Sequence, residues 1–281
     1  MTEDAAQVPL VTLQATRGWR AVPWREVVEY RDLLATLASR DVKLRYRQTA
    51  IGAAWVVLQP LVGAGLFTFI FGKVAHINLA DSRIPYFVFS FAGLLIWNLF
   101  AQIVQRCSDV MVGNAGLVSK IYFPRIVLPL SVLGAVYLDF AVSTLLLIGF
   151  CIAFHIWPGI AILWIPWALA VASLLGLGIG MWAAALNVRY RDVKYVIPVI
   201  LQFLTWASPI AYPVSAVPAA YKLIVNLNPM SPVLEMFRFG ALGYVSASAQ
   251  AVLVASVFAL VVFFAGAAFF HRSERQFADI I

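Results

Sequence analysis

The sequence is poor in charge. Only 12% of its 281 residues are Asp, Glu, Lys or Arg, whereas soluble domains carry about 25% because their surfaces face water. Hydrophobic residues make up 63% of the chain, and the mean hydropathy is +0.89. These values exclude a soluble globular protein and a disordered chain, and they favour a protein whose main solvent is lipid.

Cysteine and histidine are also scarce, with two and three residues. Cys107 and Cys151 are expected near opposite ends of two membrane spans, too far apart for a disulfide. The histidines His76, His155 and His271 fall in different connections, and no pair has the spacing of metal ligands. The sequence therefore favours neither a disulfide scaffold nor a metalloenzyme.

The sequence has no P-loop, since no lysine in a glycine-rich segment precedes Ser or Thr. Gly176, Gly178 and Gly180 form a G-x-G-x-G pattern, but it lies inside an apolar run with no strand before it. We interpret it as a small-residue face for helix packing. We therefore expect that the chain is not an enzyme. If it moves a substrate uphill, a partner ATPase is the simplest source of energy.

Long runs with little charge predict an all-α membrane protein with six transmembrane helices, because a spanning helix needs about 20 apolar residues. The expected spans are 48–72, 84–105, 127–154, 161–186, 195–212 and 249–270. The turn signal Trp157-Pro158-Gly159 separates the third from the fourth. The expected division is a tail (1–22), an amphipathic interface helix (23–47) and a transmembrane domain (48–281).

Basic residues set the expected orientation. Sixteen of the twenty Lys and Arg residues fall on the side that carries both termini; Lys73, Arg83, Lys222 and Arg238 fall on the other. Cytoplasmic segments are enriched in Lys and Arg, so both termini are expected in the cytoplasm. The net charge of +7 follows from this topology and does not indicate a nucleic-acid partner.

The segment from Pro23 to Arg47 is amphipathic. Its apolar positions recur at steps of three and four residues: Val27, Tyr30, Leu33, Leu34, Leu37 and Leu44. Arg40, Lys43 and Arg47 lie on another face. Such a helix lies in the membrane interface, either as a simple anchor or as a contact for a lipid substrate or a partner.

Residues 119–125, SKIYFPR, form a short basic and aromatic segment just before the third span. One interpretation is an interfacial aromatic belt, and the other is a docking knob for a soluble partner.

The connection 214–248 is long and rather apolar, which favours a segment with short helices that re-enters the bilayer edge. Asn228-Pro229 predicts a turn, and Ser231 followed by Pro232 predicts a capped helix start. Glu235 and Arg238 are spaced to pair on that helix.

Asp139 stands near the middle of the third span. A carboxylate there is costly and tends to face a pore or a partner. Two interpretations stay open: a role in the transport path, or a protonated or hydrogen-bonded packing residue.

Several motifs in order resemble bacterial polysaccharide ABC-transporter permeases, the membrane subunits that export O-antigen, capsule or teichoic acid chains. They are RDVKLRYRQT at 40–49 with Gly52, Trp55 and Gln59-Pro60; Phe123-Pro124-Arg125 with Pro129; Asn187 with RYRDV at 189–193; Ser208-Pro209-Ile210 with Tyr212-Pro213; and Asn228-Pro229 with Phe237-Arg238.

The resemblance implies a homodimer in the bacterial inner membrane that works with two copies of a nucleotide-binding ATPase subunit. ATP and Mg belong to that partner, and this chain is expected to bind no cofactor. The substrate it implies is a glycan on undecaprenyl diphosphate. The alternative is a permease of the same architecture that exports teichoic acid, a drug or another lipid. An integral-membrane enzyme acting on polyprenyl lipids would need clustered acids, and the acids here are isolated.

The resemblance also assigns expected roles to residues. Coupling to the ATPase falls to Lys120, Tyr122, Phe123, Pro124 and Arg125; the interface gate helix and lipid head to Tyr30, Arg40, Lys43, Arg45 and Arg47; and the cytoplasmic loop to Arg189, Arg191 and Asp192. The channel candidates are Trp97, Phe100, Asp139, Trp206 and Tyr212, and the periplasmic gate candidates are Glu235 and Arg238.

Overall fold

The computed structural model describes residues 28–47, 52–77, 79, 83–245 and 247–280. Within these residues the chain is helical and contains no strand, which confirms the all-α class. The expected tail 1–22 and the expected helix start at Pro23 lie outside the described residues.

Five stretches of the described chain are long and apolar enough to cross a membrane: Ala54–Val74, Tyr86–Gly113, Val127–Ala153, Gly159–Arg189 and Ala249–Glu274. They are built from α3 (Gly52–Phe67) with the π-helix η1 (Thr68–Val74), α4 (Tyr86–Gly113), α6 (Val127–Ala153), the 3-10 helix η2 (Gly159–Trp164) with α7 (Ile165–Arg189), and α11 (Ala249–Ile280). Five of the six expected spans are confirmed as apolar helices of sufficient length.

The expected fifth span, 195–212, is the shorter apolar helix α8 (Val193–Ala207). It ends because Ser208 precedes Pro209 and adopts an extended conformation, as residues before proline do. A count of six spans therefore stays a prediction.

Two helices run further than the sequence predicts. α4 continues past Gln105 to Gly113, and α11 continues past Phe270 to Ile280. Arginine is a good helix former, so Arg106 and Arg272 end an apolar run without ending a helix. Arg106 therefore lies within α4, although it falls just beyond the expected span 84–105.

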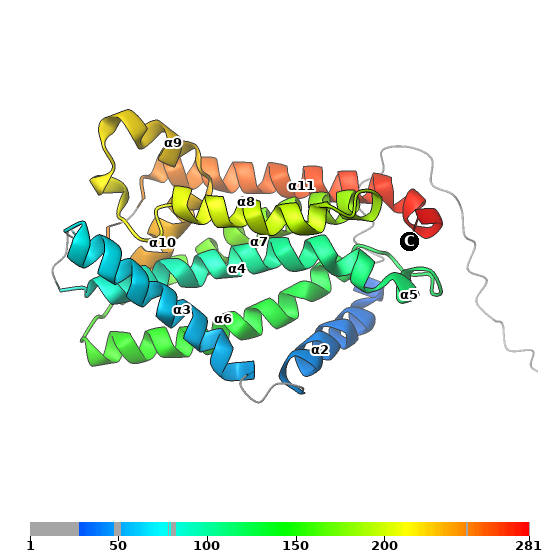
Figure 1. Cartoon of the computed structure of the whole chain (residues 1–281), viewed down its shortest axis with the longest axis horizontal. Coiled ribbons are helices and arrows are strands. Elements are labelled where there is room, and N and C mark those ends of the chain that lie inside the picture. The colour runs from blue at the N-terminus through cyan, green and yellow to red at the C-terminus, as the bar shows by residue number, and fades with distance from the viewer. Residues whose placement is uncertain (1–27, 48–51, 78, 80–82, 246, 281) are drawn as a thin grey trace, which may run out of the picture.

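The centre of the bundle is formed by α4, which packs against α3, α6, α7, α8 and α10 (Met230–Leu242). α7 lies between α4 and α11 (Figure 1). A Cβ added at Gly176 would lie 2.9 Å from Ile103 Cβ, and one at Gly180 would lie 2.5 Å from Cys107 Cβ. The glycines thus allow α7 to approach α4 closely, which confirms the predicted packing face.

The interface helix is α2 (Arg31–Arg47), which packs against α6 and touches α3. Leu37 is buried and Leu33 and Leu34 are partly buried, but Leu44 is exposed. The expected apolar stripe therefore reaches the bundle only over the first part of the helix.

The connection from α8 to α11 contains η3 (Val214–Ala216), η4 (Ala219–Tyr221), α9 (Lys222–Leu227) and α10. Short helices were expected here, but re-entry into the bilayer stays a prediction. The cap assigned to Ser231 was wrong, because α10 begins at Met230 and the Ser231 hydroxyl donates to the Val225 carbonyl, 2.6 Å away.

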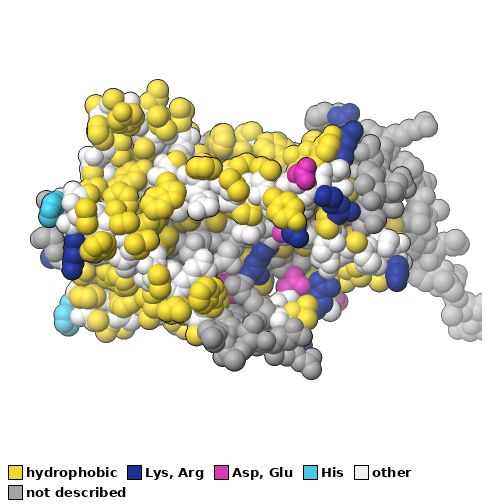
Figure 2. All heavy atoms as spheres, viewed as in Figure 1, with side chains coloured by type: hydrophobic (Ala, Val, Ile, Leu, Met, Phe, Trp, Pro, Cys, Tyr) yellow, Lys and Arg dark blue, Asp and Glu magenta, His cyan; other side chains and the backbone are white. Residues whose placement is uncertain are grey.

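The two ends of the bundle differ in charge. Dark blue Lys and Arg side chains gather at the end that carries α2 and α5 (Ala115–Val118), while the visible middle is mostly hydrophobic (Figure 2). We call this the basic end; it includes residues 119–125 and 189–194. The opposite end carries α9 and α10 (Figure 1).

Candidate functional site

The docking segment, residues 119–125, lies at the basic end between α5 and α6. Its candidate coupling residues fall into two groups. Tyr122 is 70% exposed and Lys120 is exposed, whereas Phe123 is only 4% exposed and Pro124 is buried. Phe123 and Pro124 therefore root the segment in the bundle, and Tyr122 with its exposed neighbour Ile121 forms the accessible tip.

Arg125 attaches the root of the docking segment to the end of α11. Its main-chain N–H donates to Glu274 Oε1 at 3.1 Å, and its Nη1 donates to the main-chain oxygen of Glu274. His271 Nδ1 lies 3.0 Å from Glu274 Oε2. Sequence reasoning missed Glu274, because nothing local relates it to a residue 149 positions away.

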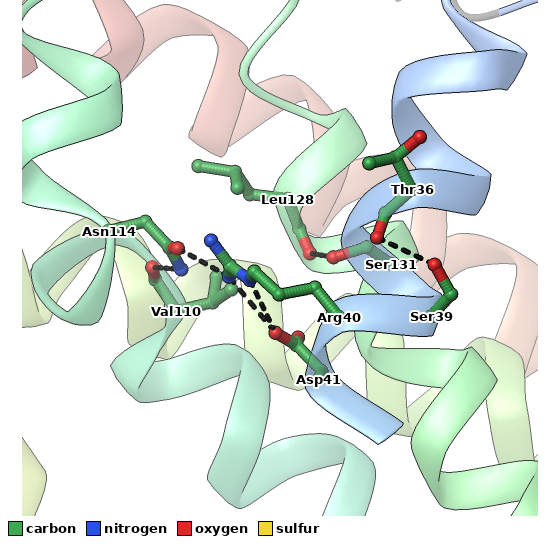
Figure 3. A network of polar contacts seen from close by, with 8 residues as sticks. All are labelled: Thr36, Ser39, Arg40, Asp41, Val110, Asn114, Leu128 and Ser131. Carbon is green, nitrogen blue, oxygen red and sulfur yellow. Dashed lines mark hydrogen bonds and ion pairs between the residues drawn. The ribbon is translucent and has the colours of Figure 1, made fainter. Parts of the chain in front are cut away.

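Arg40 joins α2 to the end of α4 (Figure 3). Its Nη2 donates to Asn114 Oδ1 at 2.7 Å and to Asp41 Oδ1 at 2.9 Å. Further along α2, a Cβ added at Gly134 of α6 would lie 2.7 Å from Ala38 Cβ. These contacts seat α2 on the outside of α4 and α6 at the basic end.

The structure describes the side chains of only some of the other interface-helix candidates. Tyr30 is half-buried and packs against the core, while Lys43 is exposed. Arg45 and Arg47 lie in α2, but their side chains lie outside the described residues. Contact between these residues and a lipid head stays a prediction.

Asp139 and Arg106 form an ion pair between α6 and α4, with Oδ2 and Nη2 3.1 Å apart. A cavity of ≈ 30 Å³ adjoins Asp139, and its polar lining consists of Gln59, Asn98, Gln102, Asp139 and Ser143. Asp139 is buried. Its pairing with Arg106 is what the interpretation as a packing residue requires. A channel role for Asp139 stays a prediction.

The aromatic channel candidates differ in how exposed their side chains are. Trp97 and Phe100 are buried, with ring centroids 5.4 Å apart. Trp206 is 50% exposed, and its ring lies edge-on to Phe67 at 5.6 Å. Tyr212 is half-buried with its ring 6.3 Å from Phe71. Within one chain, Trp206 and Tyr212 are therefore the accessible candidates beside α3 and η1.

Arg189 at the end of α7 and Arg191 and Asp192 in the loop that follows are exposed at the basic end. It is anchored by the buried Asn187, whose Nδ2 donates to the Ser108 carbonyl at 2.8 Å and to Asp109 Oδ1 at 3.2 Å. The candidate loop residues thus extend from a fixed helix end, and their contact with a soluble partner stays a prediction.

Arg238 is fully buried at the opposite end. Its guanidinium donates to the carbonyls of Phe89, Pro209 and Ile210, and its Cζ lies 3.8 Å from the Phe89 ring centroid. It thereby joins α10 to α4 and to the irregular segment that follows α8. Its hydrogen bonds go to carbonyl groups rather than to Glu235, so the expected pair is not formed as a direct hydrogen bond.

Glu235 is half-buried on the same helix. Burial raises the pKa of its carboxyl group, and the nearby charge of Arg238 lowers it by a smaller amount. Both periplasmic gate candidates therefore lie inside the packed connection between α8 and α11, and a gating role stays a prediction.

Comparisons with known proteins cover almost the whole chain. Residues 32–242 match the family model described as ABC-2 type transporter. The chain is 27% identical over 259 residues to the O-antigen export system permease protein RfbA of Myxococcus xanthus, covering 92% of this chain and 98% of that protein. A protein of the same name from Klebsiella pneumoniae is 26% identical over 255 residues, 89% and 95% of the two chains.

The polysialic acid transport protein KpsM of Escherichia coli is 25% identical over 244 residues, which cover 84% of this chain and 91% of that protein. The family match spans α2 to α10 and so includes the docking segment, the Arg106–Asp139 pair and the Arg238 contacts. Together with the five apolar helices, this identifies the chain as a multi-pass membrane permease of the ABC-2 type transporter family.

Proposed function

We propose that this chain is the membrane subunit of an ATP-driven exporter that moves a polysaccharide attached to undecaprenyl diphosphate across the bacterial inner membrane. The observation that carries the proposal is similarity over most of the chain to proteins named for O-antigen export and polysialic acid transport. Both names denote the handling of sugar polymers. A separate nucleotide-binding subunit, present in two copies, supplies ATP hydrolysis and holds ATP and Mg.

The docking segment is the proposed contact with that subunit. Ile121 and Tyr122 are exposed apolar side chains at the basic end, away from the apolar middle of the bundle. Exposed apolar residues among charges are typical of protein contacts. Lys120 beside them, with Arg189 and Arg191 of the neighbouring connection, favours a partner surface with acidic groups at its rim.

The substrate head is proposed to enter beside α2. Arg40 and Lys43 place positive charge on this helix, which suits a diphosphate. α2 packs beside α6 and α3, so movement of α2 would open the side of the bundle. Its attachment through Arg40 and Asn114 involves exposed groups and is therefore easily reversed.

The channel is proposed to form between two copies of the chain. α8 buries only Leu201 within one chain, and exposes Val199, Phe203 and Trp206 among its other residues. Trp206 and Tyr212 offer ring faces that sugars can stack on without strict sequence demand, which suits a sliding polymer. α10, with Glu235 and Arg238, would close the periplasmic end, and both termini would lie in the cytoplasm.

The test is co-purification of the full chain with a nucleotide-binding subunit, followed by measurement of ATP hydrolysis in lipid vesicles. We expect the two subunits to purify together and lipid-linked glycan to stimulate hydrolysis. Failure of both results would overturn the proposal. Stimulation by a drug or a glycan-free lipid, with none by the lipid-linked glycan, would overturn the assigned substrate.

A further inference from the structure

We propose that Glu274 of α11 is a positioning residue for the docking segment: it joins the segment to α11, so that the partner's movement reaches α11 and α7 as well as α6. The inference rests on the proposed function, because it needs an ATPase subunit that moves the segment. It assigns a coupling role to the end of the last helix, far in sequence from the segment itself.

The contact between Arg125 and Glu274 is reciprocal. The main chain of Arg125 donates to the side chain of Glu274, with 3.1 Å between N and Oε1, and the side chain of Arg125 donates to the main chain of Glu274. Each residue therefore fixes the other's backbone. Hydrogen bonds to charged groups are stronger than neutral ones, so this contact resists separation of the two elements.

Neighbours on α11 hold Glu274 in place. Oε2 of its carboxylate lies 3.0 Å from His271 Nδ1, which leaves Oε1 directed at Arg125. Arg125 Cζ lies 6.0 Å from the ring centroid of Phe277, and that ring meets Phe270 edge-on at 5.4 Å. Phe270 and Phe277 are buried. The Arg125–Glu274 contact is thus backed by an aromatic pair in the core.

From α11 the path continues through a close helix contact. A Cβ added at Gly178 of α7 would lie 2.6 Å from the Val262 carbonyl oxygen of α11. The backbones of α7 and α11 therefore touch. α7 also packs closely on α4, because a Cβ added at Gly180 would lie 2.5 Å from the Cys107 side chain. Close-packed helices do not deform continuously. A push on the docking segment would therefore displace α4, α7 and α11 together.

Two helices outside this unit, α3 and α8, have much of their surface exposed. α8 buries a single residue, Leu201, and α3 exposes Trp55, Leu58 and Val62. Movement of the α4–α7–α11 unit against α3 and α8 would change the side of the bundle that carries Trp206. The Arg125–Glu274 contact therefore connects the proposed ATPase contact to the proposed channel wall through one rigid unit.

The experiment compares Glu274→Ala, which removes the acceptor, with Glu274→Gln, which keeps an acceptor oxygen. Ser273→Ala is the matched control, because the Ser273 hydroxyl donates to Phe269 within α11. In the purified permease, amide hydrogen exchange of the peptide covering 119–126 reports the contact directly. In the full complex, the ratio of substrate-stimulated to basal ATP hydrolysis reports coupling.

We expect Glu274→Ala to speed exchange at this peptide about fivefold, the effect of losing one hydrogen bond. It should lower the stimulation ratio towards one while the ATPase still purifies with the permease. Glu274→Gln, which keeps an acceptor oxygen without the charge, should give a smaller effect than Glu274→Ala, and Ser273→Ala should behave as the unmodified chain does.

Unchanged exchange and an unchanged ratio in Glu274→Ala would overturn the inference, as would an equal loss in Ser273→Ala. If no ATPase subunit binds the unmodified chain, the proposed function fails, and the exchange measurement still decides whether Glu274 holds the segment.

Discussion

Arg106 of α4 and Asp139 of α6 meet at 3.1 Å, and both helices are among the five in the described chain that are long and apolar enough to cross a membrane. Arg106 also donates to Gln102, one turn earlier on α4, at 3.2 Å. A charge at membrane depth is costly unless it is paired. The pair therefore fixes the register of α4 against α6, because sliding either helix would leave a charge without its partner.

Removing one partner should destabilise the protein more than removing both. We expect Asp139→Ala to cost about 1–3 kcal/mol, since it leaves the half-buried Arg106 guanidinium without this carboxylate. Arg106→Leu combined with Asp139→Leu should recover most of this loss. Thermal unfolding of the detergent-solubilised permease measures both. An unfolding midpoint of Asp139→Ala equal to that of the unmodified chain would contradict the prediction.

The tip and the root of the docking segment should respond differently to truncation. Tyr122→Ala should leave the unfolding midpoint unchanged and reduce stimulated ATP hydrolysis, because the side chain is exposed. Phe123→Ala should lower stability by about 3–5 kcal/mol, the usual cost of truncating a buried phenylalanine. Both quantities can be measured on the same preparations. The distinction fails if Tyr122→Ala unfolds as readily as Phe123→Ala.

Gly93 provides the space that the Arg238 guanidinium occupies. A Cβ at this position would lie 2.8 Å from the Ile210 carbonyl oxygen and closer still to Arg238 Nη2. Gly93→Ala should therefore displace Arg238 and cost about 1–3 kcal/mol. Gly113→Ala, on the same helix, is the matched control because a Cβ there meets nothing within 4 Å. Equal unfolding midpoints for the two variants would refute this assignment.

Gly134 should be essential for seating α2. Gly134→Val would clash with Ala38, whereas Gly149→Val on the same helix has open space. Leu37 of α2 is buried, so a cysteine at this position becomes accessible when α2 is displaced. In a Leu37→Cys, Cys151→Ser background, we expect a thiol reagent to label Gly134→Val faster than Gly149→Val. The same labelling rate in both would show that α2 does not depend on this contact.

Stability should depend on pH through Glu235. Its pKa is raised in the folded chain, chiefly by burial, so the folded state holds the proton at pH values where the unfolded state has released it. Stability should then fall as pH rises from the unfolded pKa through the folded pKa. Glu235→Gln should remove this fall. The unfolding midpoints of the unmodified chain and of Glu235→Gln, measured across that pH range, test the prediction. The same dependence on pH in both would contradict it.

Apolar periodicity and turn residues were sufficient to predict most of the fold. The five long apolar helices follow from runs of low charge, and Trp157-Pro158-Gly159 divides α6 from η2 and α7 as predicted. The glycine pattern in α7 also predicted its packing face. These features depend on local composition, which the sequence displays directly.

Contacts between distant segments could not be predicted in this way. The partners of Arg238 are carbonyl groups at Phe89, Pro209 and Ile210, and main-chain acceptors have no sequence signature. Arg106 ends a charge-free run, so the expected span ends at Gln105, but its charge is neutralised by Asp139 on another helix. The pairing of Arg125 with Glu274 likewise depends on how α6 and α11 meet.

The length of α8 has a consequence for the surrounding lipid. Its fifteen residues extend about 22 Å, whereas the hydrocarbon core of a bilayer is about 30 Å thick. A short apolar helix in contact with lipid draws the two leaflets towards each other. We therefore expect a local dimple in the membrane where α8 meets lipid at the edge of the proposed channel, and there a charged headgroup has a shorter path from one aqueous surface to the other.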